Sequence, residues 1–231
     1  MTVIPVLDSR IVVRSGQVSG TLHSHDLSLL GPEERARFSA FRDRVQGACY
    51  AAAHAAVRRL LSELLDCGAG DIRFGRHNCP GCGRTSHGRP YIRAPRTSLE
   101  LSLSRSGPYW LCAIADGIRV GADVEVLRPV NAERLARLTG ALLTGNERSY
   151  MAEVPAERLP AEFIRCWTRK EAVTKASGIG IEAAMERLDV QPERSRALVR
   201  HSAGGCPTAT WTVQNLPTGP DHFAAVAFPA E

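Results

Sequence analysis

Apolar and polar residues alternate along residues 99–127, and two turn sequences, Ser106-Gly-Pro and Asp116-Gly, interrupt the alternation. Successive side chains of a β-strand point to opposite faces, so a period of two indicates strands, and short turns between them indicate antiparallel neighbours. We therefore expect adjacent antiparallel strands in the middle of the chain. The apolar residues that carry this pattern are Leu101, Leu103, Trp110, Cys112, Ile114, Val120, Val124 and Val126.

Helical patterns flank this central region. Pro32 and the two glutamates after it have the composition of a helix start, and apolar spacing continues to about Gly68, which predicts one long helix or two joined helices. Residues 75–90 are too rich in turn residues for regular structure, so we expect a loop there. After the central strands, the pattern predicts helices at 131–143, 145–151 and 161–176 and short strands at 188–190, 208–214 and 222–227.

This order of elements predicts an α+β fold with two halves of similar size, residues 1–118 and 119–231. We find no sequence repeat at a fixed period that relates the halves. An interface between two such halves is a natural place for a ligand cleft.

The composition indicates which partners to expect. A net charge of +5 favours anionic partners, which include nucleic acid, a phosphorylated cofactor and an acidic protein surface. The arginines are spread along the chain and only 6% of residues are aromatic, so we expect no nucleic-acid partner.

The beginning of the chain and its cysteines indicate the compartment. Residues 1–13 have no basic segment followed by an apolar run, which predicts no secretory signal and a cytoplasmic location. The apolar stretch 48–57 contains His54 and is far shorter than the roughly 20 residues of a membrane span, so no membrane partner is expected. The seven cysteines have mostly wide spacings, and most of them are expected to be reduced core thiols.

Two carboxylates lie two residues apart in the segment Gly121-Ala-Asp-Val-Glu125. In a strand, Asp123 and Glu125 project from one face while Val124 points into the core. Magnesium is usually held by one or two carboxylates together with substrate phosphates and water. The pair therefore indicates a magnesium site, although acids on an exposed strand face are also common without a metal.

The segment from Phe163 to Gly178 contains a second group of polar residues at helical spacing. Trp167, Glu171 and Lys175 are four residues apart, which places them on one side of a helix. A Glu and Lys pair of this kind is often only a surface pair worth about 0.2–0.5 kcal/mol. The tryptophan on the same side indicates a covered face, where the carboxylate and the amine would act beside a phosphate.

Together the two segments resemble the 4′-phosphopantetheinyl transferases. That family has a G-[IA]-D-[VI]-E strand followed about forty residues later by W-[TS]-x-K-E-A-x-x-K. Residues 101–107 are similar to its [NS]-[IL]-S-H-S-G segment and residues 87–90 to its G-[KR]-P element, and the likeness extends from about Pro32 to Gly180. It implies a monomer with two pseudo-symmetric α+β halves and coenzyme A in the cleft between them, of the kind that activates peptide and polyketide synthases.

The resemblance also implies a reaction and roles for individual residues. The serine of an acyl or peptidyl carrier protein would attack the β-phosphate of coenzyme A and release 3′,5′-adenosine diphosphate. Asp123, Glu125 and Glu171 would bind magnesium, and Glu171 or a metal-bound water would take the serine proton. Lys175 would stabilise or protonate the leaving phosphate, and Lys170 would add positive charge nearby.

Coenzyme A itself would be held by residues of the first half. The resemblance implies that Ser104 and Arg105 contact the nucleotide phosphates, although the family has histidine in place of Arg105. Arg89, in the G-[KR]-P element, would lie over the adenine or its phosphates. Arg35 and Arg37 would clamp the 3′-phosphate.

The positions of the 3′-phosphate clamp are open to a second assignment. The spacing between Asp43 and His54 does not match the family's usual run, so Arg42 and Arg44 compete with the two arginines before them.

The loop at residues 75–90 carries a possible metal site. His77, Cys79, Cys82 and His87 are potential zinc ligands, although their order and spacing match no standard zinc unit and a reduced surface turn explains them equally well. An alternative to the transferase is therefore a basic binding module with a small zinc loop.

Two further questions concern the carrier protein. Because Arg105 departs from the family pattern, the chain could also be an inactive binder of carrier proteins. Family members dock the carrier near residues 127–151, where an apolar patch or a core segment would be formed by Leu135, Leu138, Leu142 and Leu143.

Overall fold

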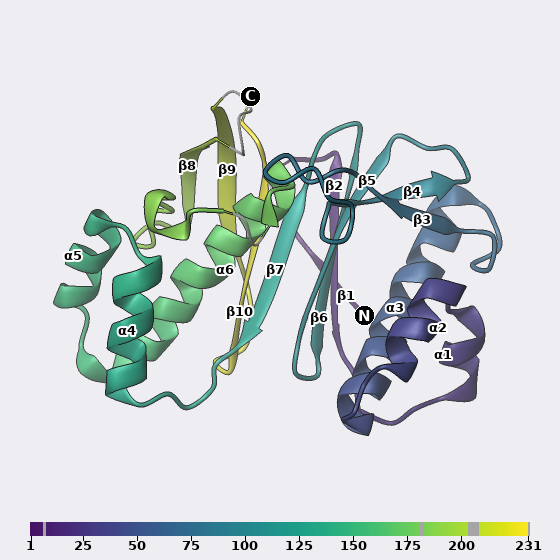
Figure 1. Cartoon of the computed structure of the whole chain (residues 1–231), viewed down its shortest axis with the longest axis horizontal. Helices are drawn as coiled ribbons and strands as arrows, with labels where there is room; N and C mark the ends of the chain where they lie inside the picture. Colours follow the sequence, from purple (N-terminus) through teal and green to yellow (C-terminus); the bar gives the residue numbers. More distant parts are fainter. Residues whose placement is uncertain (7, 181–182, 203–207, 231) are drawn as a thin grey trace.

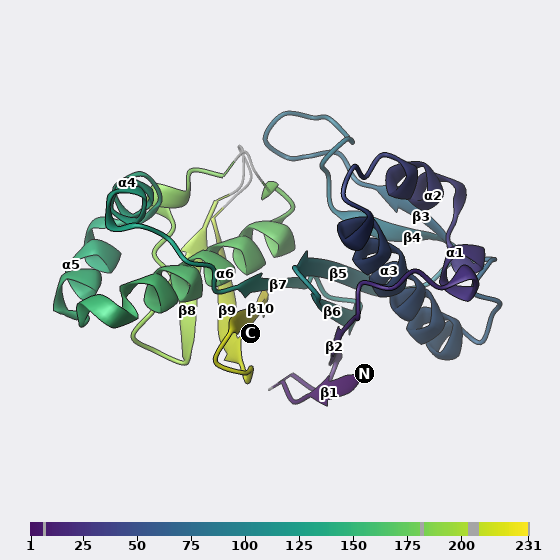
Figure 2. The ribbon, with the colours of Figure 1, turned by 90° about the horizontal axis from the view of Figure 1, so that it is seen from below.

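The computed structural model of the chain describes residues 1–6, 8–180, 183–202 and 208–230. In this part of the chain the strands form two sheets that pack face to face, with helices on the outer side of each sheet, as Figures 1 and 2 show. The predicted α+β class is therefore confirmed. The division into halves at residues 118 and 119 falls between two strands that belong to different sheets, and it remains a prediction.

The first sheet is antiparallel and has the strand order β1-β2-β6-β5-β4-β3. Its centre is the β5 and β6 hairpin, which confirms the expected antiparallel strands and turns at Gly107 with φ +55°. The strands are β1 (Thr2–Ile4), β2 (Ile11–Gln17), β3 (Arg73–Arg76), β4 (Pro90–Ala94), β5 (Leu99–Ser106) and β6 (Tyr109–Asp116).

Three helices cover the outer face of this sheet. The expected helix from Pro32 is two joined helices, because Asp43 breaks the run and caps the second one through hydrogen bonds from the N–H groups of Val45 and Gln46. Apolar residues of the long helix pack against β4, β5 and β6. The helices are α1 (Ser24–Leu29), α2 (Pro32–Ser39) and α3 (Arg44–Leu65).

The second sheet is antiparallel and has the strand order β7-β10-β9-β8. One of its faces packs against β2 and β6, and the other packs against helix α6. The strands are β7 (Gly121–Val126), β8 (Arg196–His201), β9 (Ala209–Leu216) and β10 (His222–Pro229).

The helices of the second half lie on the side of the molecule opposite α1 to α3 (Figure 2). Their positions agree with the sequence prediction to within a few residues. The longest one ends at Gly178, which has φ +86° and forms the expected left-handed C-cap. The helices are α4 (Ala132–Leu142), α5 (Gly145–Glu153) and α6 (Leu159–Ser177), with short 3₁₀ helices at Ala156–Arg158 and Met185–Arg187.

One predicted strand is wrong. Residues 188–190, which the structure describes, form no strand, and β8 begins further along the chain. The apolar side chains of Leu188 and Val190 are buried. Their backbone groups, however, form hydrogen bonds with side chains of other elements and not with a neighbouring strand. The carbonyl of Leu188 accepts from Lys170, and the N–H of Val190 donates to Glu147, so no strand partner is needed.

Three serines of β5 join the two sheets. Ser102 and Ser106 accept hydrogen bonds from the N–H groups of Ala122 and Val126 on β7, at 3.0 and 3.1 Å. Ser104, between them on the same face, also reaches β7. The edge of β7 is therefore joined to the first sheet by side-chain hydroxyls.

Gly121 allows α6 to lie very close to β7. A Cβ atom at this position would lie 2.0 Å from the carbonyl oxygen of Ala172 and 2.4 Å from the amide nitrogen of Ala176. Backbone atoms cannot move aside at such distances without shifting the helix. The glycine that opens the acidic segment therefore sets the distance between the strand and the helix that carry the polar residues.

The described residues include no helix that is both long enough and apolar enough to cross a membrane.

Candidate active site

The two acids of β7 face helix α6. Asp123 is buried and forms an ion pair with Lys175 of α6, and the charges of Asp123 and Lys175 both act on Glu125. Val124, between the acids, points the other way into the core between the sheets. The strand period thus places both carboxylates on the side from which α6 presents Glu171 and Lys175.

Hydroxyl groups from β5 orient both acids. The Asp123 Oδ1 atom accepts a hydrogen bond from Ser104 Oγ at 2.7 Å and one from Lys175 Nζ at 2.5 Å. The same ammonium group donates to Ser104 Oγ at 3.0 Å. Glu125 Oε2 accepts from Ser106 Oγ at 2.6 Å. The acids are therefore held from both halves of the chain.

The carboxyl groups of this site hold their protons more strongly than free carboxyl groups do. Burial raises the pKa of Glu171 to about 7; Lys175 opposes this shift, while the charges of Asp123 and Glu125 add to it. The pKa values of Asp123 and Glu125 are also raised, in both cases mainly by burial. A bound cation would reduce the mutual repulsion and the desolvation cost of three ionised carboxylates that lie this close together.

The donor set fits a hard divalent cation. Asp123 Oδ2 is buried and has no hydrogen-bond partner among the described residues, so an acceptor lone pair is available beside two further carboxylates. Magnesium takes oxygen ligands of this type. The oxygens of the three acids do not all lie within 4.8 Å of one another in the described part of the chain, and Lys175 holds the other oxygen of Asp123.

Comparison with known proteins places the acidic segment and α6 in one family. Residues 119–227 match the family model of the 4′-phosphopantetheinyl transferase superfamily. The chain is 29% identical over 217 residues to the 4′-phosphopantetheinyl transferase HetI of Nostoc sp., a match that covers 91% of this chain and 79% of HetI.

Residues 119–227 of the chain belong to the 4′-phosphopantetheinyl transferase superfamily.

Two other proteins match shorter parts of the chain. The 4′-phosphopantetheinyl transferase psf-1 of Bacillus pumilus is 31% identical over 121 residues, which are 51% of this chain and 49% of psf-1. A solved holo-(acyl-carrier-protein) synthase from Bacillus anthracis, in complex with CoA (3′,5′-ADP), has 18% identity and a TM-score of 0.35, and covers 49% of this chain and 98% of its own.

Lys170 lies away from this site. Its side chain is 0% exposed, and its ammonium group contacts Glu147 Oε2 at 2.7 Å and the carbonyl oxygens of Met185 and Leu188 at 2.7 and 2.5 Å. All three donors are used inside the protein. The expectation that Lys170 adds positive charge beside coenzyme A therefore does not fit its burial. Successive residues of a helix point in directions about 100° apart, so Glu171 faces the site while Lys170 faces away from it.

Arg105 lies in a second group, on the opposite face of β5 from Ser104. Its guanidinium lies over the ring of Tyr50 at 5.0 Å and over that of Phe41 at 5.9 Å, and Arg37 lies over the same Phe41 ring at 5.8 Å. Burial lowers the pKa of Arg105, and the charge of Arg37 adds to this effect. Two arginines therefore share an aromatic surface, and within the described part of the chain neither forms an ion pair with a carboxylate.

Sequence reasoning missed two members of this second group. Burial raises the pKa of Tyr50 to about 12, while the charges of Arg105, Arg37 and Arg76 oppose the shift, so all three arginines act on the same hydroxyl. Tyr50 is on α3 and Arg76 ends β3, and no local pattern links them to Arg105.

The other arginines predicted for the 3′-phosphate do not join this group. Arg35 is exposed on α2, and Arg42 and Arg44 are exposed around the start of α3. Of the four arginines considered in this region, Arg37 is the one that contacts the aromatic surface, over the Phe41 ring.

Arg89 lines a pocket of about 630 Å³ between the two halves. Its guanidinium forms an ion pair with Glu100 of β5, and Arg76 and Arg119 contribute two more positive charges to the same wall. Ser177 and Gly178, at the end of α6, close the opposite side. Arg89 therefore lies between the two halves, where the sequence predicts a ligand cleft.

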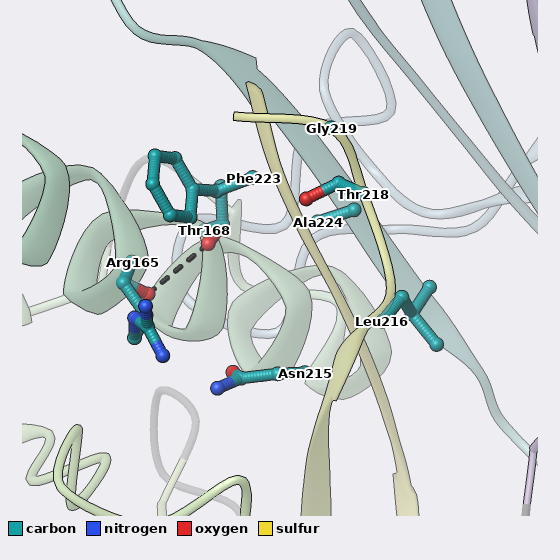
Figure 3. Close-up of a pocket in the computed structure, with 8 residues that line it drawn as sticks. All are labelled: Arg165, Thr168, Asn215, Leu216, Thr218, Gly219, Phe223 and Ala224. Atoms are coloured by element: carbon teal, nitrogen blue, oxygen red, sulfur yellow. Dashed lines mark hydrogen bonds between the residues drawn. The ribbon is translucent and has the colours of Figure 1, made fainter. Parts of the chain in front are cut away.

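A smaller pocket of about 220 Å³ lies between α6 and the ends of β9 and β10, as Figure 3 shows. Its lining includes Arg165, whose guanidinium lies over the ring of Phe223 at 5.6 Å. None of the residues predicted for coenzyme A or metal binding lines it.

The leucines considered for carrier docking are part of a core. Leu135 and Leu143 are buried, and Leu138 and Leu142 pack against them together with Phe163 of α6. Leu138 and Leu142 are only partly buried, so the segment is mainly core with two leucines that remain partly accessible.

Proposed function

We propose that the chain transfers the 4′-phosphopantetheine group of coenzyme A to a serine of an acyl or peptidyl carrier protein and uses magnesium. The observation that carries this proposal is the facing pair of β7 and α6, where Asp123, Glu125, Glu171 and Lys175 act on one another across a partly desolvated site. Membership of residues 119–227 in the transferase superfamily supports the same reaction.

The acids and the lysine would have different tasks. Asp123, Glu125 and Glu171 would hold the magnesium ion, which supplies charge neutralisation for the pyrophosphate when it is bound. In the transfer, a bond forms between the carrier serine oxygen and the β-phosphorus, and the bond from that phosphorus to the bridging oxygen of the leaving 3′,5′-adenosine diphosphate breaks. Phosphoryl transfer needs mainly positioning and charge neutralisation, so no covalent enzyme intermediate is required.

Lys175 is placed to act on the leaving group. Its side chain is 28% exposed, while its ammonium group is held by Asp123 and Ser104. We infer that it donates a hydrogen bond or a proton to the leaving phosphate. The serine proton would pass to a carboxylate of the site, for which Glu171 is the candidate.

The nucleotide end of coenzyme A would lie on the first half. We propose that Arg37, Arg76 and Arg105 around Tyr50 bind the 3′-phosphate, because these three cations form no ion pair with an acid among the described residues. Arg89 would line the adjoining pocket, and Ser104 would act from the carboxylate side of β5.

Intact-mass spectrometry tests the transfer directly. A purified apo carrier protein is incubated with the chain, coenzyme A and magnesium, and a parallel reaction contains excess chelator. We expect a mass gain of one phosphopantetheine with magnesium and none with chelator. The absence of a gain with several acyl and peptidyl carriers, together with no binding of coenzyme A in calorimetry, would contradict the proposal.

Substitution of the arginine group should weaken binding of coenzyme A. Arg37→Ala and Arg105→Ala each remove a charged hydrogen-bond donor, so we expect KM for coenzyme A to rise by roughly 10- to 100-fold, which corresponds to about 1.5–3 kcal/mol for a charged contact. Steady-state kinetics with a fixed carrier measures this effect.

The control for this experiment uses a substrate that lacks the 3′-phosphate. With 3′-dephospho-coenzyme A, the two variants and the original chain should have similar KM values, and Arg42→Ala should resemble the original chain with both substrates. An equal loss with both substrates would contradict a contact to the 3′-phosphate.

A further inference from the structure

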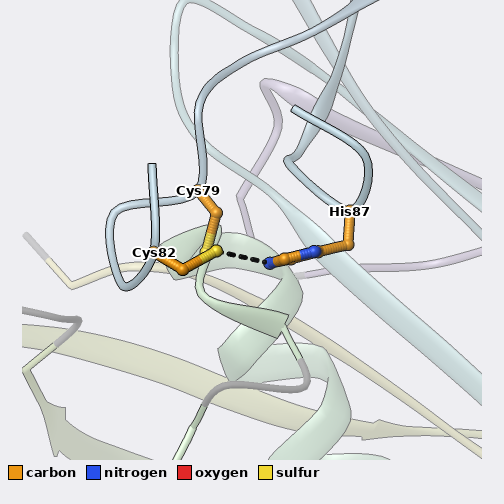
Figure 4. Close-up of side chains that lie close together, drawn as sticks. All are labelled: Cys79, Cys82 and His87. Atoms are coloured by element: carbon orange, nitrogen blue, oxygen red, sulfur yellow. Dashed lines mark hydrogen bonds between the residues drawn. The ribbon is translucent and has the colours of Figure 1, made fainter. Parts of the chain in front are cut away.

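Three potential metal ligands converge in the loop between β3 and β4. Figure 4 shows Cys79, Cys82 and His87 turned toward one another. One ligand atom from each lies within 4.8 Å of the other two, and Cys82 Sγ is 3.2 Å from His87 Nε2. Among the described residues, these three form the group of His, Cys, Asp and Glu that comes this close together.

The backbone of the loop brings the two thiols together. The N–H of Gly83 donates to the carbonyl of Cys79 at 2.8 Å, and the N–H of Cys79 donates to the carbonyl of Arg84 at 2.9 Å. Gly83 has φ +74°, a left-handed conformation that glycine adopts without strain. The turn therefore closes on itself with both cysteines at its base.

A second glycine brings the histidine to the same place. A Cβ atom at Gly88 would lie 1.7 Å from the carbonyl oxygen of His77, so only glycine permits this close passage of the two ends of the loop. His87 is thereby held beside the cysteine turn. His77 itself stacks on Tyr91, with the ring centroids 4.6 Å apart, and is not in the converging group.

The chemistry of the three side chains selects the metal. Two sulfurs and one imidazole nitrogen are typical zinc ligands, whereas magnesium takes oxygen ligands. A tetrahedral zinc ion with bonds of about 2.3 Å to sulfur and about 2.0–2.1 Å to nitrogen separates its ligands by roughly 3.5–3.8 Å. The separation of 3.2 Å between Cys82 Sγ and His87 Nε2 is close to this range, and all three ligand atoms lie within 4.8 Å of one another.

We propose that Cys79, Cys82 and His87 bind a zinc ion whose fourth ligand is a water molecule. Cys82 is exposed, so solvent reaches the open position. Cys79 is buried, and its Sγ atom lies 3.7 Å from the carbonyl oxygen of Ile179, just beyond the end of α6. The zinc site thus lies where the loop of the first half contacts the second half.

The zinc ion would hold in place one wall of the pocket between the two halves, the pocket that Arg89 lines. A Cβ atom at Gly178 would lie 3.8 Å from both Pro80 and Arg89, so the metal-bearing loop packs against the end of the helix that carries Glu171 and Lys175. His87 is followed directly by Gly88 and Arg89, and Arg89 lines that pocket. Fixing His87 therefore restricts the backbone that positions Arg89. The zinc site does not depend on the transferase activity.

Metal analysis of the full chain tests this proposal. Protein purified with thiols reduced and without chelator should contain one zinc ion per chain by inductively coupled plasma mass spectrometry. Cys82→Ser and His87→Ala should lose the zinc. Cys67→Ser should keep it, because Cys67 is a free cysteine outside the group, and Asp123→Ala should keep it, which separates this site from the carboxylate site.

A second measurement does not depend on how the variants fold. Alkylation of Cys82 in the original chain, followed by peptide mass spectrometry, should be slow in the zinc-loaded protein and fast after zinc is removed with a chelator. No zinc after reduction and addition of the metal, zinc retained in Cys82→Ser, or equal alkylation with and without zinc would each overturn the proposal. A disulfide between Cys79 and Cys82 in protein that takes up no zinc after reduction would also overturn it.

Discussion

Asp123→Asn and Glu171→Gln should each reduce transfer to a carrier protein by about 10³-fold or more. Each change removes one negative charge from the proposed magnesium site, and a bound metal contributes several kcal/mol of transition-state stabilisation, where about 1.4 kcal/mol is a factor of ten. Initial rates from intact-mass spectrometry at several magnesium concentrations measure the loss.

The same substitutions should not destabilise the fold. Burial raises the pKa values of Asp123 and Glu171, which means that their charged forms are disfavoured in the folded protein. A neutral amide of the same shape therefore leaves the melting temperature unchanged or raises it. Glu63→Gln, at an exposed acid of α3 outside the proposed site and outside the segment considered for carrier docking, is the matched control and should keep full activity. Original rates in both site variants at saturating magnesium would show that these acids do not hold the metal.

Lys170→Met should destabilise the protein by about 3–5 kcal/mol, because it leaves Glu147 as an unpaired buried charge. Both side chains are 0% exposed, and the same carboxylate also accepts hydrogen bonds from the N–H groups of Thr144 and Val190. For a chain of this size, each kcal/mol lowers the melting temperature by about 2–4 °C. Thermal and urea unfolding followed by circular dichroism measure the change.

Two further variants separate packing from binding at this position. The double variant Glu147→Gln and Lys170→Met should recover part of the lost stability, since it removes both charges together. Arg187→Met, at a side chain that is 84% exposed, should have little effect on melting. If Lys170→Met melted like the original chain but had a much higher KM for coenzyme A, the ammonium group would be a ligand-binding group after all.

Local periodicity was sufficient to predict the acidic side of the site. A strand with period two and a helix with spacing of four decide the faces of Asp123, Glu125, Glu171 and Lys175 without knowledge of the rest of the chain. The α+β class followed from the same two periods. The family resemblance then linked the strand to the helix, which no local rule could do.

The parts that were not predicted depend on contacts between distant residues. The surroundings of Lys170 are formed by Glu147 and by two carbonyl groups that follow α6, and its burial becomes evident only when these meet. Arg105 lies against Tyr50, which is distant in the sequence. Arg37 differs from Arg35, Arg42 and Arg44 only in its contact with Phe41, which the sequence does not reveal. The predicted strand at residues 188–190 is wrong for the same reason, because side chains rather than a neighbouring strand bind its backbone.

The hydrogen bonds between the three β5 serines and β7 determine whether a fragment of this chain could form the acidic site. All the carboxylates proposed for the metal lie within residues 119–227, the part that matches the family model. The hydroxyls of Ser104 and Ser106 that orient two of these acids lie before it, as does Ser102, which accepts the N–H of Ala122. A fragment that starts at residue 119 would therefore contain every proposed metal ligand and would keep the ion pair of Asp123 with Lys175, but Asp123 and Glu125 would lose the hydroxyls that orient them and the edge of β7 would lose its hydrogen-bond acceptors.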